Sequence, residues 1–71
     1  MEMMPVNSST IARVGYDAAT RTLRIEFLNG SAYEYFDVPE NVYANLINPP
    51  DGSAGQYFSR NVKGQYRYSR L

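Results

Sequence analysis

Apolar and polar residues alternate most regularly over residues 22–28. The apolar face of this segment would carry Leu23, Ile25 and Phe27, and its polar face Arg24 and Glu26. This period of two is typical of a half-buried β-strand. Weaker alternation over residues 10–16 and 32–37 predicts a strand on either side of it. We therefore expect an antiparallel meander of three strands, with a polar turn at residues 17–21 and a hairpin at Asn29-Gly30.

The length of the turn at Asn29-Gly30 decides where Tyr33 and Tyr35 point, because a shift of one residue moves every side chain to the other face. A two-residue loop places Glu34 opposite Ile25 and leaves both tyrosines on the polar face. A three-residue loop, with the glycine as a bulge residue, places Tyr33 opposite Ile25 and both rings in the core. Burying Glu34 in a small core is costly unless it is paired, so we favour the longer loop. The shorter loop stays open as an alternative.

The apolar period lengthens after residue 38, where Val42, Tyr43, Leu46 and Ile47 follow the spacing of one helix face. We predict a helix over residues 39–48, which begins at Pro39 and stops before Pro49-Pro50.

A second helix is expected from Ala54 to about Asn61, after the capping pair Ser53 and Gln56 and before the terminator Gly64. Residues 66–71 alternate again and predict a fourth strand. It would pair with the first strand or with the third.

These elements predict one α+β domain over residues 8–71, after a flexible N-terminal lead-in of residues 1–7. The fold would be an antiparallel β-meander of three strands, two short helices on one face, and a C-terminal fourth strand, which together hide a single apolar face. The opposite sheet face would meet solvent or a partner. The residues expected on this open face are Arg13, Arg24, Glu26, Phe36 and some of Arg67 or Arg70.

Composition narrows the chemistry. The 71 residues include no cysteine and no histidine, so neither a disulfide framework nor a conventional zinc site is expected. No histidine is present to activate a serine, and the carboxylates are scattered without a recognisable acid–base pair. We therefore expect no enzyme, no cofactor and no metal. The N-terminus lacks the features of a signal peptide and no stretch is apolar enough for a membrane span, which predicts a cytoplasmic protein.

The net charge is zero, but the charges are unevenly distributed along the chain. Residues 25–51 contain five acids and no base, and residues 52–71 contain four bases and no acid. Cations interleaved with aromatic rings are the ingredients of a surface for single-stranded nucleic acid. The candidate RNA-binding residues are Arg60, Lys63, Tyr66, Arg67, Tyr68 and Arg70. The alternative is that the basic segment folds against the acidic one and neutralises it.

The order and spacing of several short motifs over residues 8–71 resemble the KTSC domain, which is named after the C-terminus of some lysyl-tRNA synthetases and also occurs as small stand-alone bacterial and phage proteins. The motifs are Val14-Gly15-Tyr16-Asp17, Phe27, Asn29-Gly30, Tyr33-Glu34-Tyr35, Val38-Pro39, Val42-Tyr43, Ser53-Ala54-Gly55, Tyr57-Phe58 and Tyr66-Arg67-Tyr68. The motif residues expected to be structural are Tyr16, Asp17, Phe27, Gly30, Tyr33, Tyr35, Val38, Pro39, Tyr43, Gly55 and Phe58. The chain departs from the family pattern at Ser59, where Asn is usual, and at Val62-Lys63, where Ile-Arg is usual.

The resemblance implies no established activity, only an association with RNA through the synthetases. A small RNA-binding module is our first hypothesis for this chain. The alternative is a protein-interaction or homodimerisation module that uses the open sheet face or an edge strand. No membrane partner is expected.

Overall fold

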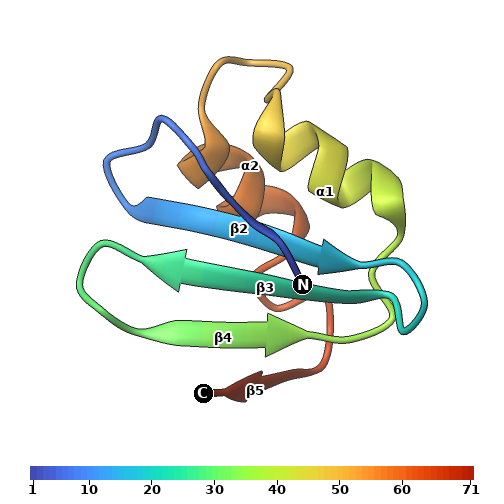
Figure 1. Ribbon diagram of the computed structural model, residues 1–71. Coiled ribbons are helices and arrows are strands. Elements are labelled where there is room, and N and C mark those ends of the chain that lie inside the picture. The colour runs from blue at the N-terminus through green and yellow to red at the C-terminus, as the bar shows by residue number, and fades with distance from the viewer.

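The computed structural model describes residues 1–71 as a five-stranded antiparallel sheet with two helices on one face. Figure 1 shows both helices on the same side of the sheet. The elements are β1 (Met3–Pro5), β2 (Ile11–Asp17), β3 (Thr22–Phe27), β4 (Ala32–Tyr35), α1 (Glu40–Ile47), α2 (Ala54–Asn61) and β5 (Tyr68–Arg70). The strands lie side by side in chain order, each antiparallel to the next. The α+β class, the meander, the two helices and the C-terminal strand are confirmed.

The N-terminus differs from the expected flexible lead-in. Met3–Pro5 forms β1, which pairs with β2 and adds a fifth strand to the sheet. The segment is only three residues long and includes a proline, so it is too short to show the alternation of apolar and polar residues that identifies a strand. Only its backbone pairing with β2 defines it as a strand. It also explains Gly15, because a side chain there would collide with the Met3 Sδ atom.

The hairpin between β3 and β4 has the three-residue loop. Ile25 pairs with Tyr33, and Leu23 pairs with Tyr35. The Phe27 amide donates to the Ser31 carbonyl at 2.8 Å, and Gly30 adopts a φ of +93°, a conformation that favours glycine. The tyrosines therefore point toward the helices, as the favoured register predicts. Tyr35 is buried and Tyr33 is half-buried.

Both helices lie within one residue of their predicted bounds. Pro39 occupies the N-cap of α1. At α2 the Ser53 Oγ accepts a hydrogen bond from the Gln56 amide at 3.2 Å, and Gly64 follows the helix with a φ of +77°. The short chain from Gly64 then returns to the sheet, where β5 pairs with β4 and not with β2.

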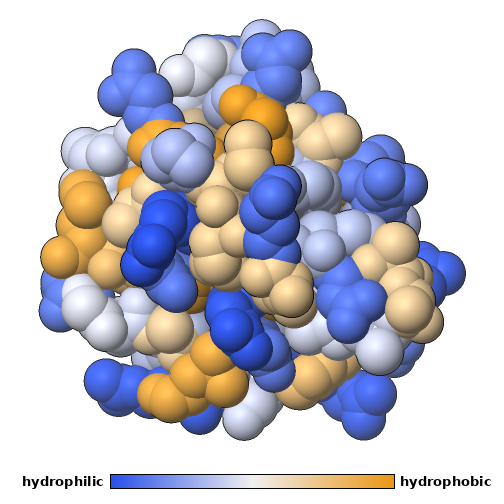
Figure 2. Space-filling model, viewed as in Figure 1, coloured by the Kyte–Doolittle hydropathy of each residue, from blue (hydrophilic) through white to orange (hydrophobic).

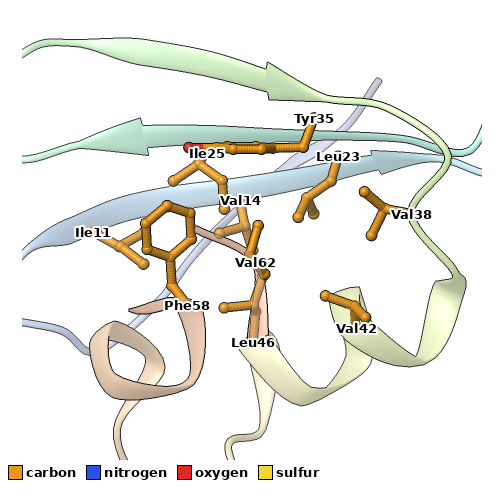
Figure 3. Close-up of a cluster of buried hydrophobic side chains, with 10 residues drawn as sticks. All are labelled: Ile11, Val14, Leu23, Ile25, Tyr35, Val38, Val42, Leu46, Phe58 and Val62. Atoms are coloured by element: carbon orange, nitrogen blue, oxygen red, sulfur yellow. The ribbon is translucent and has the colours of Figure 1, made fainter. Parts of the chain in front are cut away.

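The core lies between the sheet and the two helices (Figure 3). Its members are Ile11, Val14, Leu23, Ile25, Tyr35, Val38, Val42, Leu46, Phe58 and Val62. Tyr16 and Tyr43 stack at its edge with ring centroids 5.5 Å apart, and the Tyr16 hydroxyl donates to the Val38 carbonyl at 2.5 Å. This bond ties β2 to the chain entering α1.

The sheet face opposite the helices carries ion pairs. Arg13 lies 2.5 Å from Glu26, and Arg24 donates to Glu34 through Nε and Nη2 at 3.1 and 2.6 Å. On the side of the molecule that Figure 2 shows, apolar groups are scattered among charged ones rather than joined in one broad patch. The expectation that Arg13, Arg24 and Glu26 share the open face is confirmed by their strand register.

Candidate functional site

Five aromatic rings meet where α2 leaves the sheet uncovered. Tyr68 on β5 lies 5.8 Å from both Tyr33 and Tyr35, and these two rings stack on each other at 6.4 Å. Phe58 from α2 approaches Tyr35 edge-on at 5.6 Å and Phe27 at 5.5 Å. Tyr33 and Tyr35 of the first Tyr-x-Tyr motif thus meet Tyr68 of the second, far apart in the sequence, because β4 and β5 are neighbouring strands.

This cluster forms the wall of a cavity of about 490 Å³, here called the aromatic pocket. All five rings line it, together with Thr10, Ile11, Gly55, Ser59, Lys63 and Gly64. Its size falls within the range of small-ligand sites, which are mostly apolar with a few polar groups. Tyr68 is 61% exposed, so its ring offers a face to a ligand.

A second cavity of about 410 Å³, here called the hydroxyl furrow, adjoins the aromatic pocket. The two share Thr10, Gly55 and Ser59 as lining residues. The remaining lining residues of the furrow are Ser9, Ser53, Gln56 and Arg60, and none of the seven is hydrophobic. One side of α2 therefore faces an aromatic cavity that passes into a polar one.

Charge around the aromatic pocket is positive and unbalanced. Lys63 lines the pocket, and the Arg70 guanidinium lies over the Tyr33 ring at 5.8 Å from its centroid. No carboxylate pairs with either cation, whereas Arg60 lies 3.9 Å from Asp51 and Arg67 lies 3.4 Å from Asp37. Two of the four C-terminal cations thus pair with the acidic middle of the chain and the other two flank the pocket.

The candidate RNA-binding residues separate into three groups. Lys63, Tyr68 and Arg70 gather at the aromatic pocket. Arg60 lines the adjoining furrow. Arg67 pairs with Asp37 away from both cavities, and Tyr66 is half-buried against the core.

Sequence patterns did not identify Phe27, Phe58 or the tyrosines of β4 as pocket residues, because their spacing predicts core positions. Tyr35 and Phe58 belong to the core, Phe27 and Tyr33 pack half-buried against it, and all four also line the pocket. Ser59 and Lys63 offered a signal, since they are two of the positions at which the chain departs from the KTSC pattern, and both line the aromatic pocket.

Burial, followed by the proximity of Tyr33 and Tyr68, raises the pKa of Tyr35 to about 12. Its pKa in the unfolded chain is about 10, so the folded state holds the phenolic proton more tightly. This contribution to stability is complete below pH 10 and is lost as the pH rises from 10 to 12, and the loss amounts to about 2–3 kcal/mol.

Urea unfolding of the wild type and Tyr35→Phe at pH 8, 10 and 12 measures this effect. We expect the variant to gain stability relative to the wild type by about 2–3 kcal/mol between pH 8 and 12, because it has no phenol to ionise. A constant difference over this pH range would contradict the raised pKa.

The structure contains no group of three or more carboxylate, histidine or cysteine side chains placed to hold a metal ion. Neither helix is long and apolar enough to cross a membrane. What the site presents is aromatic surface, hydroxyl groups and cations.

Comparison with known proteins agrees with the motif pattern. The KTSC domain matches residues 7–66. A lysine–tRNA ligase of Nostoc punctiforme is 41% identical over 69 residues, which are 97% of this chain but 12% of the ligase. A protein of Tsukamurella paurometabola is 37% identical over 92% of this chain and 94% of its own length. The crystal structure of a KTSC domain protein from Yersinia pestis superposes with a TM-score of 0.88 at 34% identity, over 99% of this chain and 96% of that one. The chain belongs to the KTSC domain family.

Proposed function

We propose that the chain is a non-catalytic module that binds single-stranded RNA weakly. Unstacked bases would lie against Tyr68 in the aromatic pocket, with phosphates held by Lys63 and Arg70. The observation that carries this proposal is the exposed Tyr68 ring at a pocket flanked by two cations without acidic partners.

Base stacking and phosphate contacts of this kind would give weak and salt-sensitive binding. Stacking of a base on an aromatic side chain contributes about 1–3 kcal/mol, and it tolerates any base because every base has a π-face. Phosphate contacts add an electrostatic contribution that salt removes. The zero net charge of the chain supplies no long-range attraction, so affinity depends on the local cations. The related lysine–tRNA ligases act, by name, on an RNA, which agrees with this ligand class.

A charge-matched pair of double variants tests the proposal. Lys63→Gln with Arg70→Gln removes the two pocket cations, and Arg13→Gln with Arg67→Gln removes two cations elsewhere. Both carry the same net charge. We expect the salt dependence of affinity for a short single-stranded RNA, plotted as log K against log salt, to become shallower by about 1.4 in the pocket variant only. Fluorescence anisotropy with a labelled octanucleotide at several salt concentrations measures it.

Equal loss of affinity in both double variants would show that only net charge matters and would contradict RNA binding at the aromatic pocket. No binding by the wild type at low salt would refute RNA binding altogether.

Protein interaction is a second candidate, favoured by one observation. The strand β5 lies at an edge of the sheet and all three of its residues are exposed, so its free backbone groups offer pairing to another chain. Only three residues are available for such pairing, which makes this candidate weaker. Sedimentation at increasing protein concentration distinguishes it, since homodimerisation through β5 requires a concentration-dependent mass.

A further inference from the structure

We infer that the aromatic pocket and the hydroxyl furrow together hold one ribonucleotide, with its base in the pocket and its ribose and phosphate in the furrow. The module would then prefer RNA to DNA of the same sequence. This inference rests on the proposed function and specifies the chemical unit that the site takes.

The two cavities share part of their lining. Thr10, Gly55 and Ser59 line both of them, so a ligand that fills the aromatic pocket continues over these residues into the hydroxyl furrow. Gly55 stands at the junction without a side chain. A Cβ built on Gly55 would lie 3.5 Å from the Ser8 Oγ and 3.7 Å from the Thr10 Oγ1, which is ordinary contact distance. The passage is therefore narrow enough for a larger side chain to close.

The linings of the two cavities match the two halves of a nucleotide chemically. The aromatic pocket offers ring faces, which suit a base. The hydroxyl furrow has no hydrophobic lining residue and offers hydroxyl, amide and guanidinium groups, which suit a ribose and a phosphate. From the aromatic pocket to the furrow, the lining residues change from aromatic to polar, in the same order as the base, the sugar and the phosphate of a nucleotide.

The hydroxyls in and around the furrow differ in whether the chain itself already uses them. The Ser8 Oγ accepts from the amides of Thr10 and Ile11, and the Ser53 Oγ caps α2. The Ser59 and Thr10 hydroxyls make no hydrogen bond within the chain, although both lie at the junction. A ribose 2′-hydroxyl both donates and accepts, and it is the group by which a protein distinguishes RNA from DNA at one site.

The cations are placed to accompany such a ligand. Arg60 lines the furrow and Lys63 lines the aromatic pocket, three residues apart at the C-terminal end of α2. Phosphates on the two sides of the bound sugar would each find one cation. The contact of Arg60 with Asp51, at 3.9 Å between charged atoms that are largely exposed, is weak enough to exchange for a phosphate.

The test compares octa-adenylate RNA with octa-deoxyadenylate DNA at one low salt concentration. We expect the RNA to bind about tenfold more tightly. Ser59→Ala with Thr10→Val removes the two free hydroxyls at the junction and is expected to weaken RNA binding by about threefold to tenfold while leaving DNA binding unchanged, because one or two hydrogen bonds to the 2′-hydroxyl are lost.

A second pair of variants tests the junction. Gly55→Leu places a large side chain where the cavities meet and is expected to lower RNA affinity at least about tenfold. Gly55→Ala is the matched control and should retain most of the affinity. Alanine forms helices better than glycine and its Cβ meets only ordinary contacts, so the thermal midpoint of Gly55→Ala should be no lower than that of the wild type. The thermal midpoint of Gly55→Leu, measured beside it, reports whether the larger side chain disturbs the fold. This readout separates a blocked site from a damaged fold.

The outcomes distinguish the inference from the proposed function. Equal affinity for RNA and DNA, or equal loss of both in the hydroxyl variant, would overturn ribose recognition while single-stranded binding stands. Full RNA affinity in Gly55→Leu would show that the ligand does not pass between the cavities. Absence of binding to either nucleic acid at low salt would refute the proposed function itself.

Discussion

Phe58→Ala is expected to remove a large share of the stability of this domain. The ring is 7% exposed and lies edge-on to Tyr35 and Phe27, so its removal leaves a cavity at the centre of the packing between α2 and the sheet. Truncation of a buried phenylalanine typically costs about 3–5 kcal/mol. A 71-residue domain is stable by about 4–11 kcal/mol on the usual scale per residue.

Urea unfolding followed by circular dichroism measures the loss. Leu28→Ala is the control, because Leu28 is a large apolar residue in the exposed hairpin loop and its truncation should cost less than about 0.5 kcal/mol. A loss below about 1.5 kcal/mol in Phe58→Ala would mean that the ring is not part of the core.

Tyr68→Ala is expected to have the opposite profile, with a large loss of RNA affinity and little loss of stability. The ring is 61% exposed, so little of its packing is needed for folding. Losing one stacked base removes about 1–3 kcal/mol of binding free energy, which corresponds to an affinity about 5-fold to 150-fold weaker. Tyr68→Phe should bind nearly as well as the wild type, because the stacking face remains.

Tyr66→Ala provides the internal comparison for this prediction. Tyr66 belongs to the same motif but packs half-buried against the core. We expect this variant to lose stability in thermal unfolding. If Tyr68→Ala binds RNA with unchanged affinity and unfolds at the temperature of the wild type, then no base stacks on Tyr68 and this part of the proposal is wrong.

The meander and both helices could be predicted because local patterns specify them. The alternation around Ile25 and the cost of burying Glu34 were sufficient to select the three-residue turn at Gly30. Ser53 and Gln56 located the start of α2, and the structure contains the corresponding capping bond. In these segments, short-range chemistry and long-range packing favour the same structure.

Other features depend on pairing between distant segments, which no local pattern records. The strand β1 exists only through backbone bonds to β2, and β5 is placed only by its pairing with β4. The aromatic pocket depends on this second pairing, because Tyr68 meets Tyr33 and Tyr35 only when β5 lies beside β4. Sequence analysis identified Lys63, Tyr68 and Arg70 by composition, but it could not separate them from Arg67 and Tyr66.

The ion pairs, too, could not be predicted from local sequence patterns. The uneven distribution of acids and bases is visible in the sequence, and it permits both a neutralised segment and a basic surface. The structure contains both outcomes, with Arg60 and Arg67 beside carboxylates and Lys63 and Arg70 without them. Which cations pair is decided by the geometry of the turns that carry Asp37 and Asp51.

RNA binding at the aromatic pocket can be mapped by amide chemical shifts of the ¹⁵N-labelled protein during titration with a single-stranded octanucleotide RNA at low salt. We expect the largest shifts at Gly55, Ser59, Lys63, Gly64 and Tyr68, which line the aromatic pocket. Amides of Arg13, Arg24 and Glu26, on the opposite face of the sheet, should stay in place. Shifts concentrated on that opposite face, or no shifts at all, would contradict the account.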